Sequence, residues 1–144
     1  MNGRFWLTVL VVTILGFFGG WLVFGELMSG FYESHSSEAA NNLAFEEPRV
    51  WAIAIGTLAW GLLITWVLQK TGSNDFQKGL INGLIIGFLV SVIFDFSLYA
   101  MWDMSDSTLV IVDIIVGTVF WGILGGVGGW VLGMQPKAAE ATAS

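Results

Sequence analysis

Four long apolar stretches alternate with short polar breaks along the chain. The apolar stretches cover about residues 5–28, 50–69, 79–102 and 109–134. Each has the roughly 20 residues that an α-helix needs to cross a hydrocarbon core about 30 Å thick. None alternates like a transmembrane β-strand, and each is about twice the length of one. Because exposed backbone groups find no partner in lipid, the pattern predicts an all-α membrane protein, a single four-helix transmembrane bundle over residues 1–144.

The polar breaks are predicted to connect these helices. Residues 29–49 are expected to form the longest loop, residues 70–78 and 103–108 tight turns, and the tail after Pro136 is small and polar. Arg4 ahead of an apolar run also resembles a cleaved signal peptide. However, the run exceeds 20 residues and no small-x-small cleavage site follows it closely, so we expect the first helix to be retained.

The distribution of basic residues predicts the orientation. Arg4, Lys70, Lys78 and Lys137 fall on one side of a four-span layout, whereas Arg49 falls on the other. Lysine and arginine are enriched on the cytoplasmic side of a membrane. We therefore expect an inner (cytoplasmic) membrane protein with both termini in the cytoplasm.

The second and fourth apolar stretches share the pattern Gly-Thr-x-x-Trp-Gly-x-Leu, at residues 56–63 and 117–124, with an apolar residue in the seventh place. The first and third stretches match more weakly, at residues 15–17 and 86–88. One interpretation is a duplicated helical hairpin, a parallel repeat about an axis along the membrane normal. The other is a good packing motif that occurs twice.

Small residues recur at helical spacing in the third and fourth stretches. Close backbone approach through such residues supplies packing energy between helices in lipid, so we expect a tightly packed bundle. An alternative is that residues 125–129 form a flexible hinge or an unwound segment lining a cavity. The positions expected to pack are Gly79, Gly83, Gly87, Ser91, Gly117, Gly122 and Gly126.

Three carboxylates lie inside or at the edge of the apolar stretches: Glu26, Asp95 and Asp113. All three are expected in the outer half of the bilayer, and hairpin geometry brings Asp95 towards Asp113. Two carboxylates in a low-dielectric site do not both ionise easily. A shared proton, a bound cation or exposure to a hydrated vestibule would each resolve the conflict. These residues are therefore a candidate ion or proton site, with hydration and helix capping as the alternative.

The composition excludes several kinds of function. The chain is 56% apolar and 11% charged, has no cysteine and carries a net charge of −6, so neither a disulfide framework nor a nucleic-acid surface is expected. The single histidine, His35, is expected in a solvated loop, because metal sites usually bring two or more imidazoles. No catalytic set, phosphate-binding loop or dinucleotide fingerprint is present. We therefore expect no catalytic residue, cofactor or metal.

The second half of the chain resembles small bacterial four-helix inner-membrane proteins. The similarity is carried by Phe94-Asp95-Phe96-Ser97, Trp102, Val112-Asp113 and Gly117-Thr118. Those families are known only as domains of unknown function. The resemblance therefore implies a fold and a location, and it implies no activity.

Two hypotheses of function follow from these features. The first is a non-catalytic scaffold, assembly factor or membrane-complex subunit that packs through glycine-rich helix faces, with the lipid bilayer and a homodimer or larger complex as partners. The second is a small dimeric transporter or channel that handles protons or cations through the outer carboxylates. A membrane enzyme with a carboxylate pair has less support. A close, enclosed Asp95–Asp113 pair favours the second hypothesis, and side chains splayed into solvent favour the first.

Overall fold

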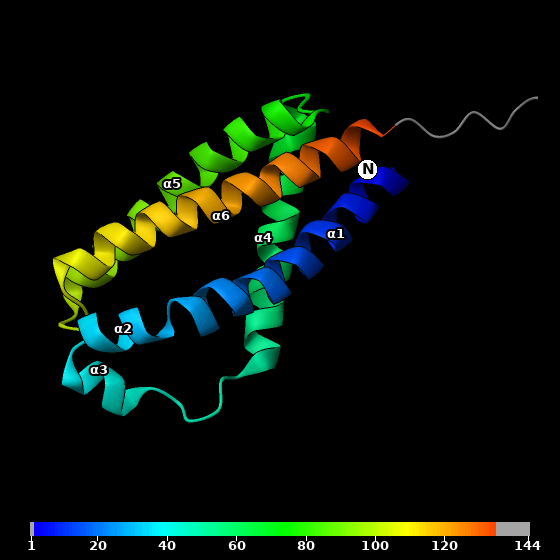
Figure 1. Cartoon of the computed structure of the whole chain (residues 1–144). Helices are drawn as coiled ribbons and strands as arrows, with labels where there is room; N and C mark the ends of the chain where they lie inside the picture. The colour runs from blue at the N-terminus through cyan, green and yellow to red at the C-terminus, as the bar shows by residue number, and fades with distance from the viewer. Residues whose placement is uncertain (1, 135–144) are drawn as a thin grey trace, which may run out of the picture.

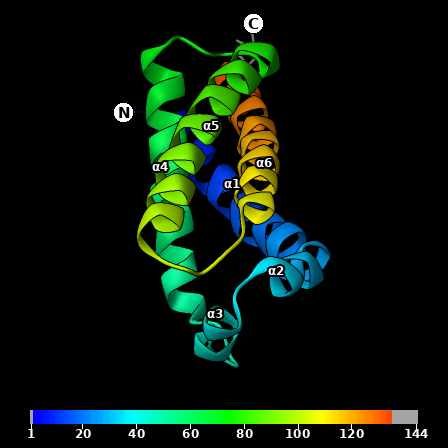
Figure 2. The same cartoon turned by 90° about the vertical axis from the view of Figure 1, so that its left-hand side faces the viewer.

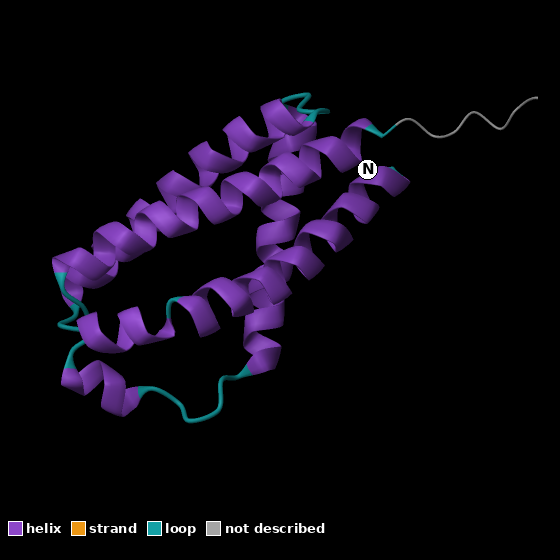
Figure 3. Cartoon of the chain, in the orientation of Figure 1, coloured by secondary structure: helices purple, strands orange, loops and turns teal. Residues whose placement is uncertain are grey.

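The fold is built from four long helices (Figure 1). The computed structural model describes residues 2–134, and within this range it contains helices and no strand (Figure 3). Each long segment has the length and the mean hydropathy, 1.9 to 2.3, that allow it to cross a membrane. The long segments are α1 (Gly3–Gly20) with its π-helical continuation η1 (Trp21–Leu27), α4 (Val50–Lys70), α5 (Phe76–Met101) and α6 (Ser107–Gly133).

The segment expected to be a loop over residues 29–49 contains two short helices, so that prediction is wrong. α2 (Ser29–His35) continues the rod of α1 and η1, and α3 (Glu38–Leu43) follows it. The Ser37 side chain caps α3 by accepting a hydrogen bond from the Ala40 N–H at 3.1 Å. Such a cap satisfies a backbone donor that the helix itself leaves free.

Aspartate caps explain why α5 and α6 begin earlier than residues 79 and 109. The Asp75 carboxylate accepts a hydrogen bond from the Lys78 N–H, and the Asp106 carboxylate accepts one from the Leu109 N–H, each at 2.8 Å. Hydropathy predicts where a segment enters the lipid, whereas the capping residues determine where the helix itself begins. The connecting turns are correspondingly shorter, over residues 71–75 and 102–106.

The helices run between two ends of the bundle (Figure 1). The proximal end holds the start of α1, the 71–75 turn and the end of α6, where Gly133 contacts Asn74. The distal end holds α2, α3 and the 102–106 turn, which is joined to α2 by a hydrogen bond from the Asp106 N–H to the His35 carbonyl. The described chain therefore starts and finishes at the same end. Lys137 and the polar tail lie outside the described residues.

The four helices are packed unequally. α5 and α6 are in close contact along their length, whereas α4 crosses α1 and α6 steeply (Figures 1 and 2). The proximal part of α4 is buried against α1 through Ile64 and Leu68, which meet a core that includes Phe5, Val9 and Val12. The residues of the first turns of α4, over residues 50–56, are all exposed. α4 thus diverges from the bundle towards the distal end.

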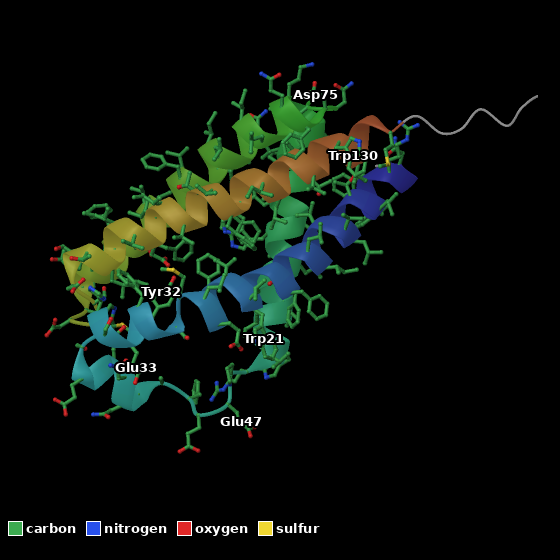
Figure 4. All side chains as sticks on the ribbon, viewed as in Figure 1. Trp21, Tyr32, Glu33, Glu47, Asp75 and Trp130 are labelled. Atoms are coloured by element: carbon green, nitrogen blue, oxygen red, sulfur yellow. The ribbon has the colours of Figure 1, made fainter. Side chains whose placement is uncertain are left out.

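Large apolar side chains cover the outside of the helices (Figure 4). Only 6% of the residues in the apolar stretch of α5 are buried, and only 39% of those in the apolar stretch of α6. A monomeric soluble protein rarely exposes contiguous apolar surface on this scale. The surface is therefore that of a membrane protein.

α6 is an unbroken α-helix from Ser107 to Gly133. The alternative of an unwound stretch at residues 125–129 is therefore wrong, whereas that of a flexible hinge stays a prediction. These glycines are buried against neighbouring helices. Close packing keeps the glycine-rich stretch helical, since backbone hydrogen bonds in lipid have no water to exchange with.

Candidate functional site

Asp95 and Asp113 face each other near the distal end of the α5–α6 pair. Asp113 follows the first turn of α6, and Asp95 lies on the last turns of α5. Because α5 and α6 are antiparallel neighbours, the two carboxyl groups are within hydrogen-bonding and coulombic range of each other. Both residues are half-buried.

Tyr32 of α2 completes this cluster. Its hydroxyl donates a hydrogen bond to Oδ1 of Asp113, a residue 81 positions away in the sequence. Burial and the bound Asp113 carboxylate raise the pKa of Tyr32 above its ordinary value, so the phenol keeps its proton and remains a donor. The contact also fastens α2 to α6.

One carboxylate oxygen of the cluster has no donor. Oδ2 of Asp95 is buried and, among the residues described, no group donates a hydrogen bond to it. The described chain contains a single ion pair, Lys78–Asp75, and that pair lies at the proximal end. A buried charge without a partner is costly. A proton held between Asp95 and Asp113 would provide both the missing hydrogen bond and the missing neutralisation.

Glu26 belongs to a different site. It lies on η1, is exposed, and accepts a hydrogen bond from Nε1 of Trp21 at 3.2 Å. It also lines an apolar cavity of about 550 Å³ between η1, the start of α4 and the middle of α6. The three acidic residues singled out by sequence are thus divided between a carboxyl pair and a separate cavity.

The small residues of α5 contact the backbone of α6. A Cβ built on Gly83 would lie 2.6 Å from the Trp121 carbonyl oxygen, and one built on Gly87 would lie 2.9 Å from Cβ of Trp121. Gly79 packs against Gly125, and Ser91 packs against Gly117. The α5 stripe is therefore used inside the chain.

The remaining glycines singled out in α6 contact side chains of α5. A Cβ built on Gly122 would lie 2.5 Å from Leu84, and one built on Gly126 would lie 2.7 Å from the Phe76 ring. These glycines are likewise buried within the α5–α6 contact.

His35 has local partners in α2. Its Nδ1 lies 2.9 Å from Oγ of Ser34 and 3.0 Å from the Phe31 carbonyl oxygen, and its ring stacks on Phe31 with centroids 4.1 Å apart. In the part of the chain that the structure describes, no three histidine, cysteine or acidic side chains gather as a metal site would require. The cluster at the distal end is thus composed of two carboxyls and one phenol.

Sequence reasoning missed Tyr32. A signal for it exists, because Phe24, Met28 and Phe31 continue the helical spacing i, i+4, i+7 beyond the end assigned to the first helix. Extending that helix would have placed Tyr32 on the same rod. Its pairing with Asp113 depends on the angle between α2 and α6, which no local pattern encodes.

Comparison of the chain with protein-family models, with curated proteins and with solved structures finds no match.

Proposed function

We propose that the protein is a four-span integral protein of the cytoplasmic (inner) membrane with both termini on the cytoplasmic side. The apolar exterior and the four candidate spans support the membrane setting. The orientation is supported by Arg4, Lys70 and Lys78, which all belong to the proximal end, against Arg49 alone at the start of α4. Basic residues favour the cytoplasmic side.

We also propose that the chain arose by duplication of a helical hairpin. Equivalent glycine–threonine contacts support this. Gly16 of α1 packs on Thr57 of α4, and Gly87 of α5 packs on Thr118 of α6. The threonine hydroxyls make equivalent bonds to the carbonyls four residues earlier, at 2.8 Å and 2.6 Å. The paired positions differ by 71 residues between α1 and α5 and by 61 residues between α4 and α6.

The same offsets relate a second set of contacts. Gly61 packs on residues 9 and 13, and Gly122 packs on residues 80 and 84. The tryptophans of the two motifs, Trp60 and Trp121, stack on each other with ring centroids 4.1 Å apart and an interplanar angle of 12°. Equivalent residues that touch each other are expected where a local symmetry axis passes. A packing motif that merely occurs twice would not require this correspondence.

Within this frame, we propose a non-catalytic membrane component, a scaffold, assembly factor or complex subunit, whose distal end is held together by a shared proton. The observation that carries the proposal is the buried, donorless Oδ2 of Asp95 beside Asp113, which is itself bonded to Tyr32. Protonation of the pair favours the docked position of α2. Deprotonation leaves like charges on Asp95 and Asp113 facing each other, which pushes the distal ends of α5 and α6 apart and thereby displaces the Asp113 acceptor that holds Tyr32 of α2.

Transport of protons or cations is the second candidate, because the pair is close and half-buried. The proximal half of the α5–α6 contact argues against a path along it, since Gly79 and Gly83 lie against the backbone of Gly125. The hypothesis of a scaffold that binds its partners through glycine-rich faces also changes in one respect. The glycine stripes are occupied internally, so a second copy or another subunit would bind mainly through exposed apolar side chains.

Hydrogen exchange of α2 as a function of pH tests the proposal. In the full chain in lipid nanodiscs, the protection factors of residues 29–35 should fall as the pH rises, by up to about tenfold per pH unit, since one proton is released. Asp95→Asn should keep α2 protected throughout, because the neutral amide donates to Asp113. Asp103→Asn, at an exposed position of the same end, is the matched control and should behave like the parent chain.

The outcomes separate the candidates. Protection that does not depend on pH in the parent chain would contradict the shared proton. Proteoliposomes carrying an internal pH dye test transport in the same preparation. A proton flux abolished by Asp95→Asn but not by Asp103→Asn would favour the transporter over the scaffold.

A further inference from the structure

The duplicated hairpins are α1 with α4, the first, and α5 with α6, the second. The cavity beside Glu26 lies at the distal end of the first hairpin, where α1 and α4 are not in contact. In the second hairpin Ser91 packs against Gly117. The positions that correspond by the same offsets are Gly20 and Gly56, and among the described residues nothing beyond the adjacent backbone of α4 lies within 4 Å of a Cβ built on Gly56. The divergence of α4 opens a space of about 550 Å³ at this level, within the range of ligand pockets.

The π-helical turn gives this cavity a polar rim. In an α-helix, residues five apart lie on different faces, because the period is 3.6 residues. The wider π-turn, with i→i+5 bonding, brings Trp21 and Glu26 to one side, where the indole N–H donates to the carboxylate. Gly25 lies beside the indole, where an added Cβ would make ordinary van der Waals contact at 3.4 Å.

The depth of the cavity matches one leaflet of a bilayer. Its lining extends from Glu26, at the end of the first span, to Gly16 and Trp121 near the middle of the bundle. Ten residues of helix rise about 15 Å, which is half of a hydrocarbon core about 30 Å thick. The rim is accessible from the side, because Ile53 is 47% exposed and Trp21 is 54% exposed.

The charge of the rim selects the headgroup. The residues lining the cavity include one acidic side chain, Glu26, and no lysine, arginine or histidine. Trp21 donates to Oε1 of Glu26 and thereby orients the carboxylate, while the second oxygen is left to accept from a ligand. A cationic donor suits this carboxylate.

From this geometry we infer a binding site for a phospholipid with a primary ammonium headgroup, with an acyl chain in the cavity and the ammonium on Glu26. The lipid would occupy, between α1 and α4, the position that corresponds to the closed contact of Ser91 with Gly117 between α5 and α6. Neither a soluble amine nor a lipid without the amine satisfies both the apolar depth and the acidic rim.

Native mass spectrometry of the full-length protein tests the site, after equilibration in nanodiscs containing equal amounts of phosphatidylethanolamine and phosphatidylglycerol. The parent chain should retain phosphatidylethanolamine preferentially. Glu26→Gln should reduce that preference about tenfold, the ratio expected for loss of a charge-assisted hydrogen bond. Glu33→Gln, at an exposed position on α2 outside the cavity, is the control for charge and should leave the preference unchanged.

A second pair of variants tests the apolar part. Ile53→Trp adds a ring to the cavity wall and should lower retention of both lipids, whereas Ile55→Trp, at a position 61% exposed and outside the lining, should not. Equal retention by the two tryptophan variants would overturn the proposal. So would a preference that Glu26→Gln and Glu33→Gln leave equally unchanged, even if Ile53→Trp displaced lipid, because the occupant would then not be recognised by its amine.

Discussion

Gly83→Ala tests the claim that backbone contact holds α5 against α6. The added Cβ would lie 2.6 Å from the Trp121 carbonyl oxygen and 2.9 Å from Cα of Gly125. Ordinary carbon–oxygen approaches of this kind are about 3.3–3.6 Å. Both obstacles are backbone atoms of a helix, so no side chain can rotate away. The two helices must therefore separate locally by roughly 0.5–1 Å.

A separation of this size forfeits about a quarter to a half of the dispersion energy of each contact it opens. Overpacking of a close-packed interior typically costs about 1–3 kcal/mol. The gain in helix propensity from glycine to alanine, about 1 kcal/mol in water, opposes this cost. Subtracting this gain from the cost leaves a net loss of up to about 2 kcal/mol in the free energy of unfolding.

Reversible unfolding in mixed micelles of lipid and denaturing detergent measures this loss. Gly56→Ala is the matched control, because it makes the same substitution on α4 where, among the described residues, nothing beyond the adjacent backbone of that helix lies within 4 Å of the new methyl group. It should leave the free energy of unfolding unchanged or raise it. If Gly83→Ala proves as stable as Gly56→Ala, close backbone contact does not hold this pair together.

Three further predictions concern other contacts. Tyr32→Phe removes the donor to Asp113 and should raise hydrogen exchange across α2 by an amount equivalent to about 1.5–3 kcal/mol, an expectation that unchanged exchange would refute. Alanine substitutions of Trp60 and Trp121 should show a coupling of about 0.5–1.5 kcal/mol in a double-mutant cycle of unfolding, because their rings stack; additive effects would exclude the stack. Gly126→Ala should cost less stability than the α5 substitution above, because its new methyl group meets a half-exposed aromatic ring that can swing aside; an equal loss in the same micelle assay would show that this ring is fixed.

The spans were predictable because lipid imposes a simple requirement. Any segment that crosses it must be apolar for about 20 residues and must satisfy its own backbone. The ends of α5 and α6 were predictable in principle, since Asp75 and Asp106 are strong caps in the printed sequence. The steep crossing of α4 was not, because helix crossing depends on the fit of whole surfaces. The π-turn of η1 has no recognised sequence signal.

The site could be predicted in part for the same reason. A short turn between antiparallel helices brings the end of one beside the start of the next, which places Asp95 near Asp113. The same reasoning cannot place Tyr32, which lies in the long connection after η1, nor Glu26, which lies in the π-helical turn of η1 itself. Its position in the sequence predicts for Glu26 the same depth in the bilayer as for the two aspartates. Depth in the bilayer does not determine which side of the bundle a residue occupies.

The unequal lengths of the helices have a consequence for how the protein responds to the thickness of its bilayer. α4 has 21 residues and α6 has 27, or about 31 Å and 40 Å of rise. A core of about 30 Å therefore matches α4 standing upright, whereas α6 is about 10 Å longer and fits by tilting. Helices of different length that cross steeply, as α4 and α6 do, can each match the same core. In a thicker membrane the longer helices would tilt less, and the angle between them and α4 would decrease.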